Sequence, residues 1–274
     1  MTLIFRYLIA GCLWILVSGM AQSHDFWIEP NQFTPGKNEP VEISLRFGVG
    51  FKGDSLPFIN ALFNDFSLTD ASGRTDIQSI QGNDPAAIIS ATSGAQLLGY
   101  QSEPQFVEID AEKFYQYTEE EGIEYIRAVR ERRGESNLPA PENFIRCAKA
   151  LVQTGPAGQD IYGRQLGYTL ELIPQSDPYQ LKKGESLDFL LLYQGKPIDG
   201  LQLQALSKAD PTNVQKVRTD KNGKASVTID EPGPWLIKVV LILPVAQRQQ
   251  IVEGAKNALW QSYWASYVFA LAEG

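Results

Sequence analysis

The chain contains a single histidine, His24, in the stretch HDFWIEP. If a signal peptidase cuts after Ser23, His24 becomes the first residue and offers two nitrogens, its α-amine and its ring Nδ1, to one metal ion. A free α-amine has a pKa near 7.7–8.0, so a metal can displace its proton at neutral pH. Imidazole suits nickel, cobalt and copper. We therefore expect His24 to bind a divalent transition metal (Ni, Co or Cu), with Asp25 or a carboxylate from elsewhere adding an oxygen ligand.

One histidine excludes many other kinds of site. A site with several histidine ligands and an H-E-x-x-H motif are both impossible, and a Ser-His-Asp or Cys-His site would have to use His24 itself. No glycine-rich phosphate loop stands between a strand and a helix. Glu119, Glu120 and Glu121 are a weaker candidate for a metal site, and a solvated helix face explains them more simply. The net charge of −8 argues against a nucleic-acid partner. These exclusions favour a protein that is not an enzyme.

The first 23 residues have the pattern of a secretory signal peptide. Arg6 precedes an apolar run from Tyr7 to about Val17, and small residues follow it. Cleavage after Ser23 leaves His24 at the N-terminus, cleavage after Ala21 leaves two more residues, and a lipobox reading would make Cys12 the first residue. The apolar run is shorter than the roughly 20 residues that span a bilayer. We expect a periplasmic protein with no membrane span after cleavage, whose remaining cysteine, Cys147, is a buried hydrophobe.

Short strands dominate the part of the chain that would position His24. Val41, Ile43, Leu45 and Phe47 alternate with polar residues, and a turn at 71–73 separates two further strands. Trp27 is expected to be a core anchor. From Asp110 the apolar spacing becomes helical, Gly122 divides two helices and Gly134 ends the second. The stretch ENFIRCAKALVQTG reads as a third short helix, with Phe144, Cys147, Ala148 and Leu151 inward.

The rest of the chain returns to strands. Hairpin signals stand at 196–200 and at 220–223, and alternation from 259 to 269 predicts a closing strand. We predict an all-β protein of two β-sandwich domains: a signal peptide over residues 1–23, an N-terminal sandwich over 24–175 with a helical insertion at about 110–153, and a C-terminal sandwich over 176–274.

Several motifs in order resemble one bacterial exported family, called domain of unknown function 4198. They are HDFWIEP, EEEGI, RCAKALVQTG, LGYTLELIPQSDPYQLKKGE, GKPIDG, RTDKNGKASVTI, GPWLIKV and WQSYWASYVFAL. The resemblance implies a periplasmic accessory component of nickel and cobalt uptake, with a C-terminal transthyretin-like module. Members often carry a further histidine in the stretch that matches FGVGFKGD, where this chain has Val49 or its neighbours.

Three functions follow from these observations. The first is an exported binding protein for nickel or cobalt uptake, whose partner is a membrane metal-uptake system or another envelope protein. The second is an envelope interaction or scaffold module that binds no metal. The third is a hydrolase that uses paired carboxylates, although no spacing among the 32 acidic residues singles out a pair.

Overall fold

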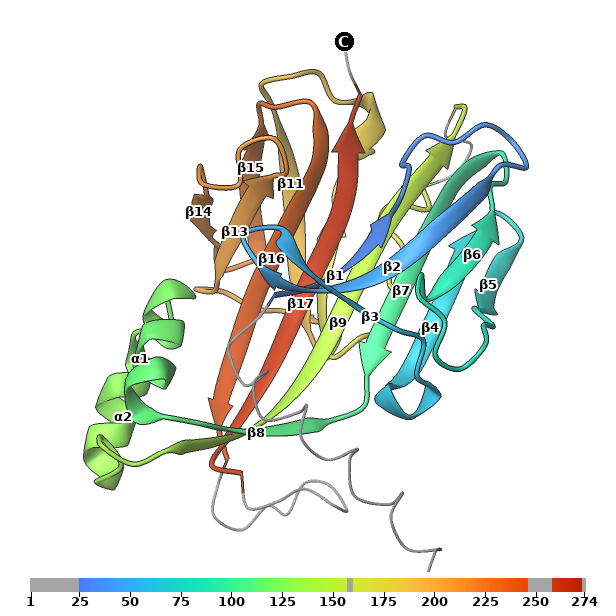
Figure 1. Ribbon diagram of the computed structural model, residues 1–274. Helices are drawn as coiled ribbons and strands as arrows, with labels where there is room; N and C mark the ends of the chain where they lie inside the picture. Colours follow the sequence, from blue (N-terminus) through green and yellow to red (C-terminus); the bar gives the residue numbers. More distant parts are fainter. Residues whose placement is uncertain (1–24, 157–159, 246–257, 273–274) are drawn as a thin grey trace, which may run out of the picture.

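The structure is a computed structural model that describes residues 25–156, 160–245 and 258–272 (Figure 1). The expected signal peptide, its alternative cleavage sites, Cys12 and His24 lie outside these residues. Within them, no helix is both long enough and apolar enough to span a membrane.

A central sheet runs through the molecule and takes strands from the whole length of the chain. Its strand order is β14-β13-β16-β17-β9-β7-β4-β5, and β8 pairs with β9 beside this path. Its nine strands are β4 (Phe63–Asp70), β5 (Gly73–Asp76), β7 (Gly94–Ser102), β8 (Gln105–Ile109), β9 (Ala140–Thr154), β13 (Gln202–Ser207), β14 (Gln215–Arg218), β16 (Gly233–Pro244) and β17 (Trp260–Leu271). The β17–β9 pair is parallel and joins the two halves of the chain.

Two smaller sheets complete the fold. The N-terminal sheet contains β1 (Asp25–Pro30), β2 (Pro40–Val49), β3 (Lys52–Leu56) and β6 (Ala87–Ser90), and the C-terminal sheet contains β10 (Leu170–Pro174), β11 (Glu185–Tyr193), β12 (Lys196–Pro197) and β15 (Lys224–Ile229). Short 3₁₀ turns lie at Asn60–Leu62 and Pro178–Gln180.

The two smaller sheets cover opposite faces of the central sheet. Successive residues of a strand point to opposite faces. Ile237 belongs to the core shared with the C-terminal sheet, whereas its neighbour Leu236 belongs to the core shared with the N-terminal sheet. Leu97 and Leu98 divide in the same way. The protein is therefore an all-β sandwich in which the central sheet is the middle layer.

A pair of helices is inserted between β8 and β9. The helices α1 (Ala111–Glu120) and α2 (Tyr125–Arg133) cover one end of the central sheet (Figure 1). Their core includes Val240 and Ile242 of β16. Both lie an even number of residues after Leu236, so their side chains point to the same face of the central sheet as that of Leu236. The N-terminal sheet and the helix pair therefore lie on the same face of the central sheet.

Several expectations are confirmed. Val41, Ile43 and Leu45 are buried together, Gly122 separates the two helices, and Gly134 ends α2 in the left-handed conformation. Trp27 is fully buried, and the closing strand is present as β17.

The expected third helix is wrong. Residues 140–154 form β9, so the helical insertion ends at Arg133 and not near residue 153. A central strand that is covered on both faces has apolar residues at nearly every position, and its inward residues then satisfy helical spacing by accident. In β9, Cys147 and Leu151 face one core while Ala148 and Ala150 face the other.

The division near Gln175 stays a prediction. Strands from both sides of it pair in the central sheet, and the core under the C-terminal sheet includes Leu97 and Leu151 as well as Leu187 and Phe189.

Candidate functional site

The residue that follows His24 is held at the start of β1. Asp25 pairs with Gly48 of β2 and is 5% exposed. Its carboxylate Oδ1 lies 2.6 Å from the Lys238 ammonium. Asp25 is therefore fixed both by the sheet and by a buried ion pair.

Lys238 projects from β16 into the gap between the N-terminal sheet and the helix pair. Its Nζ also lies 2.7 Å from Oε1 of Glu121. Gln204 of β13 donates to Oε2 of Glu121 at 2.9 Å and to the Glu120 carbonyl at 3.1 Å. We call Asp25, Glu121, Gln204 and Lys238 the N-terminal ion cluster.

The turn after α1 brings Glu121 into this cluster. α1 ends at Glu120, and Gly122 follows with φ of +70°. A Cβ on Gly122 would approach Oε1 of Gln202 at 2.7 Å, but that atom ends a flexible side chain that can move, so the positive φ is what favours glycine here. The tight turn directs Glu121 inward while Glu119 and Glu120 stay exposed.

The pKa values of the cluster follow from burial and from pairing. Burial raises the pKa of Glu121, and the Lys238 ammonium offsets only part of that rise. Burial acts to lower the pKa of Lys238, but the Asp25 and Glu121 carboxylates together raise it above its usual value. Lys238 therefore stays charged at neutral pH, and a single cation serves two carboxylates.

Two neighbours complete the surroundings of the cluster. Arg146 of β9 lies 5.2 Å from the ring centroids of both Phe26 and Phe144, and burial lowers its pKa to about 10. Its charge reaches Asp25, although no ion pair joins them. Ser266 stands directly opposite Lys238 in the β16–β17 register, and among the described residues its buried Oγ has no partner.

A further buried carboxyl lies under the helix pair. Glu142 of β9 accepts hydrogen bonds from Ser262 and Tyr117, and its Oε2 has no partner within the described part of the chain. Burial raises its pKa to about 7, and the two hydrogen bonds offset part of this effect. Glu142 is 2% exposed, so a substrate could reach it only if the helices moved. Its present role is packing, and its protonation is sensitive to pH.

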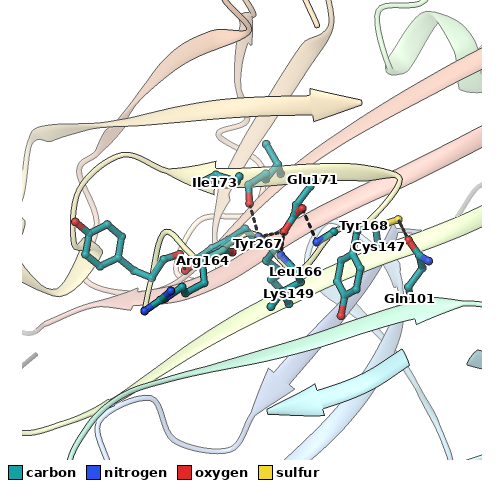
Figure 2. A network of polar contacts seen from close by, with 12 residues as sticks. Gln101, Cys147, Lys149, Arg164, Leu166, Tyr168, Glu171, Ile173 and Tyr267 are labelled. Carbon is teal, nitrogen blue, oxygen red and sulfur yellow. Dashed lines mark hydrogen bonds and ion pairs between the residues drawn. The ribbon is translucent and has the colours of Figure 1, made fainter. Parts of the chain in front are cut away.

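A third buried ion pair lies on the opposite face of the central sheet (Figure 2). Nζ of Lys149 lies 2.6 Å from Oε1 of Glu171 and also donates to the carbonyls of Arg164 and Leu172, each at 3.1 Å. The Glu171 carboxylate accepts from the backbone nitrogens of Leu166 and Gly167. This pair fastens the irregular segment 163–168 to the sheet.

Metal ligands do not gather elsewhere in the described residues. No group of three or more His, Cys, Asp or Glu side chains there could hold a metal ion. Asp25, which follows His24 in the sequence, and Glu121 both already bind Lys238. A metal site at Asp25 would need further ligands from outside the described residues, and His24 is the adjacent donor.

Sequence reasoning missed part of this arrangement. Glu121 was assigned to a solvated helix face, but it is 4% exposed, and Arg130 of α2 is also fully buried. Cys147 is buried as expected, and burial raises the pKa of its thiol to about 12, so it is a poor nucleophile. Lys238 and Lys149 were not singled out. Each is a lone lysine inside an apolar strand, PWLIKVVLIL or CAKALV, and that pattern is the signal that could have found them.

Comparison with models of protein families identifies the family of this chain. A search of the curated proteins found no match to the chain. The model of the family described as "Domain of unknown function (DUF4198)" matches residues 21–242, a span that includes Asp25, Glu121, Gln204 and Lys238. The chain therefore belongs to the DUF4198 family.

Proposed function

We propose that this chain is an exported, non-catalytic periplasmic protein that binds a divalent transition metal, nickel or cobalt, at its processed N-terminus. The observation that carries the proposal is the fixed position of Asp25. Register pairing with Gly48 and the ion pair with Lys238 anchor the residue that directly follows His24. A chelating residue bonded to an anchored neighbour loses less conformational freedom when it binds.

The α-amine and Nδ1 of His24 supply two nitrogen ligands, and a carboxylate oxygen supplies a third. Two carboxylates, those of Asp25 at the start of β1 and of Glu121, share the Lys238 ammonium ion. The charge of Arg146 also reaches Asp25. A membrane metal-uptake system or another envelope protein is the partner that this role requires.

The buried state of the other reactive groups supports a role without catalysis. The Cys147 thiol and the Glu142 carboxyl are both enclosed. His24 is the one imidazole in the sequence, so a role in metal binding leaves none for proton transfer.

Calorimetric titration of Ni²⁺, Co²⁺ and Cu²⁺ tests the proposal on protein exported and processed by a bacterial host, with the N-terminus verified by intact mass. We expect stoichiometric binding of micromolar strength or better, lost in His24→Ala. A chain with one extra N-terminal residue keeps the imidazole but displaces the α-amine, and it should also lose the tight binding. Glu108→Gln, at an exposed position in β8, is the control for a general change of charge and should bind normally.

Absence of binding with a verified His24 terminus would overturn the metal proposal. The alternative is then an envelope interaction module. One observation favours that alternative: Val49, at the end of β2, is 64% exposed beside a turn in which Gly50 and Phe51 both have positive φ. Co-purification of an envelope protein that is lost in Val49→Ser would support this second function.

A further inference from the structure

A hollow of about 320 Å³ lies between the β4–β5 turn and the segment that follows residue 163. One wall is formed by Thr69, Asp70, Arg74 and the turn 71–73, and the other by residues 164–166. This volume is at the small end of the range of about 300–1,000 Å³ that is typical of pockets for small molecules.

Thr69 brings an unsatisfied hydroxyl to this hollow. It is 8% exposed, and its buried Oγ1 has no hydrogen-bond partner among the described residues. Phe66 and Leu68 belong to the core under the N-terminal sheet, so Thr69 points to the opposite face, as Ser67 does. A buried hydroxyl without a partner is costly, and a ligand oxygen in the hollow would satisfy it.

Arg74 brings a guanidinium group that is already held in place. Its Nη2 lies 2.7 Å from Oδ2 of Asp65, its Nη1 donates to the Leu166 carbonyl at 2.9 Å, and its Nε donates to Ser67. Among the described residues each nitrogen has one partner, which leaves one N–H on each terminal nitrogen for a ligand. Because the group is fixed before binding, little side-chain entropy is lost when those donors are used.

Arg164 brings a second guanidinium group that is not engaged. Its side chain is exposed, and it makes no hydrogen bond or ion pair with the described residues. Figure 2 shows the side chain directed away from Lys149 and Glu171. Among the described residues that line the hollow, Asp70 is the one acidic residue, and its two oxygens accept from the Ser72 nitrogen and the Thr92 hydroxyl.

The buried pair Lys149–Glu171 holds the wall that carries Arg164. Lys149 donates to the Arg164 carbonyl, while Glu171 accepts from the backbone nitrogens of Leu166 and Gly167 (Figure 2). A buried ion pair contributes little net stability by itself. Here it gives an irregular segment a fixed backbone, as a preorganised binding wall requires.

We propose that this hollow is a binding site for a small oxyanion, the carboxylate or phosphate group of a small molecule. The oxygens of the ligand accept from Thr69 Oγ1, from the two free N–H groups of Arg74 and from Arg164. Planar guanidinium groups match both kinds of oxyanion, with charge-assisted bonds. The site uses residues far in sequence from the N-terminal ion cluster and goes beyond the proposed metal function.

Calorimetric titration with inorganic phosphate and with citrate, at one fixed ionic strength, tests this site in the full processed chain. We expect saturable binding of at least one of the two. It should weaken at least about tenfold in Arg164→Gln, because a charge-assisted hydrogen bond is lost. Thr69→Val conserves shape and removes the hydroxyl, and it should weaken binding while leaving the protein folded.

Arg132→Gln is the matched control, since Arg132 is an exposed arginine on α2 outside the hollow. Binding of citrate alone identifies a carboxylate site, and binding of phosphate alone identifies a phosphate site. No saturable binding of either probe at millimolar concentration would overturn the proposal. Equal weakening by Arg132→Gln and Arg164→Gln would also overturn it, because the effect would then be one of general charge. His24→Ala should bind both probes normally, so failure of the metal proposal leaves this result unaffected.

Discussion

Two buried lysines lie on opposite faces of the same sheet, and their surroundings differ. Lys149 faces the C-terminal sheet, has one carboxylate partner and two carbonyl partners, and burial lowers its pKa. Lys238 faces the N-terminal sheet, has two carboxylate partners, and its pKa is raised because the carboxylates outweigh burial.

The Lys149 site is closed and balanced in charge. The side chains of Lys149 and Glu171 are 2% and 3% exposed, and one positive charge meets one negative charge. Such a site has no capacity for another ion, and its hydrogen bonds go to the backbone of one irregular segment. These contacts hold that segment against the central sheet.

The Lys238 site has two carboxylates for one ammonium group. The Lys238 side chain is 11% exposed, and the charge of Arg146 also reaches Asp25. The comparison teaches that burial of a lysine is not itself a functional signal, because the two sites differ in the number of carboxylates that share the ammonium group.

The largest effect is expected from Lys149→Met. The change leaves the Glu171 carboxylate buried without its cation, and breaking one side of a buried pair costs about 3–5 kcal/mol. The free energy of unfolding, measured by urea titration, should fall by an amount in the upper part of that range. Lys224→Met, at an exposed position in β15, is the control and should change stability little.

The double variant Lys149→Met/Glu171→Leu should be less destabilised than Lys149→Met alone, because no uncompensated charge is left. If Lys149→Met is as stable as the native chain, the Lys149–Glu171 pair does not hold the segment 163–168 to the sheet.

Lys238→Met should cost about 3 kcal/mol at pH 7, less than the change at Lys149 because the Lys238 side chain is more exposed, at 11% against 2%. Its effect should also depend on pH. Without Lys238, the pKa of Glu121 in the folded protein rises further. A carboxyl whose pKa is higher in the folded than in the unfolded state stabilises the fold at low pH, and this contribution is lost as pH rises. The difference in unfolding free energy between Lys238→Met and the native chain should therefore shrink as pH falls from 7 to about 4. A difference that is constant with pH would place Asp25 and Glu121 outside any charge coupling with Lys238.

Sequence alone predicted much of the fold and little of these clusters, because it reports local patterns and not the contacts between distant residues. Alternation in β2 and β17 and the glycines at 122 and 134 are local signals, and these elements form as expected. The identity of β9 depends on its parallel pairing with β17, more than 100 residues later, and no local spacing reports that pairing.

The candidate site shows the same limit. Asp25 was predicted from its place beside His24, but its partners Glu121 and Lys238 come from other strands and turns. Glu121 has the sequence surroundings of an exposed helix end, and the turn at Gly122 is what buries it. Convergence of distant residues is set by tertiary packing, which composition and spacing do not encode locally.

Glu142→Gln should produce a smaller effect of opposite sign. The pKa of Glu142 is raised to about 7 from 4.5, so the folded state keeps a proton that the unfolded state releases, and stability falls as pH rises from about 4.5 to 7. At about 1.4 kcal/mol per pKa unit this amounts to at most about 3 kcal/mol.

Glutamine does not titrate. Urea titrations across this pH range should show Glu142→Gln more stable than the native chain at pH 8, by about 1–3 kcal/mol, with a flatter dependence on pH. Glu108→Gln, at an exposed position in the neighbouring strand β8, should leave the pH dependence of stability unchanged. A native-like slope in Glu142→Gln would assign the proton uptake to another group.

The smallest effect is expected at an exposed pair that joins the helix insertion to β14. Arg218 binds the Glu124 carboxylate and also donates to the Gly122 carbonyl at 3.0 Å. The two side chains of the pair are 44% and 72% exposed, and exposed pairs contribute about 0–1 kcal/mol. Glu124→Gln should therefore lower the free energy of unfolding by less than about 1 kcal/mol, and added salt should remove the difference. A loss as large as that of Lys238→Met would mean that the helices are held mainly by this surface contact, and the buried Lys238–Glu121 pair could then no longer be regarded as their main electrostatic anchor.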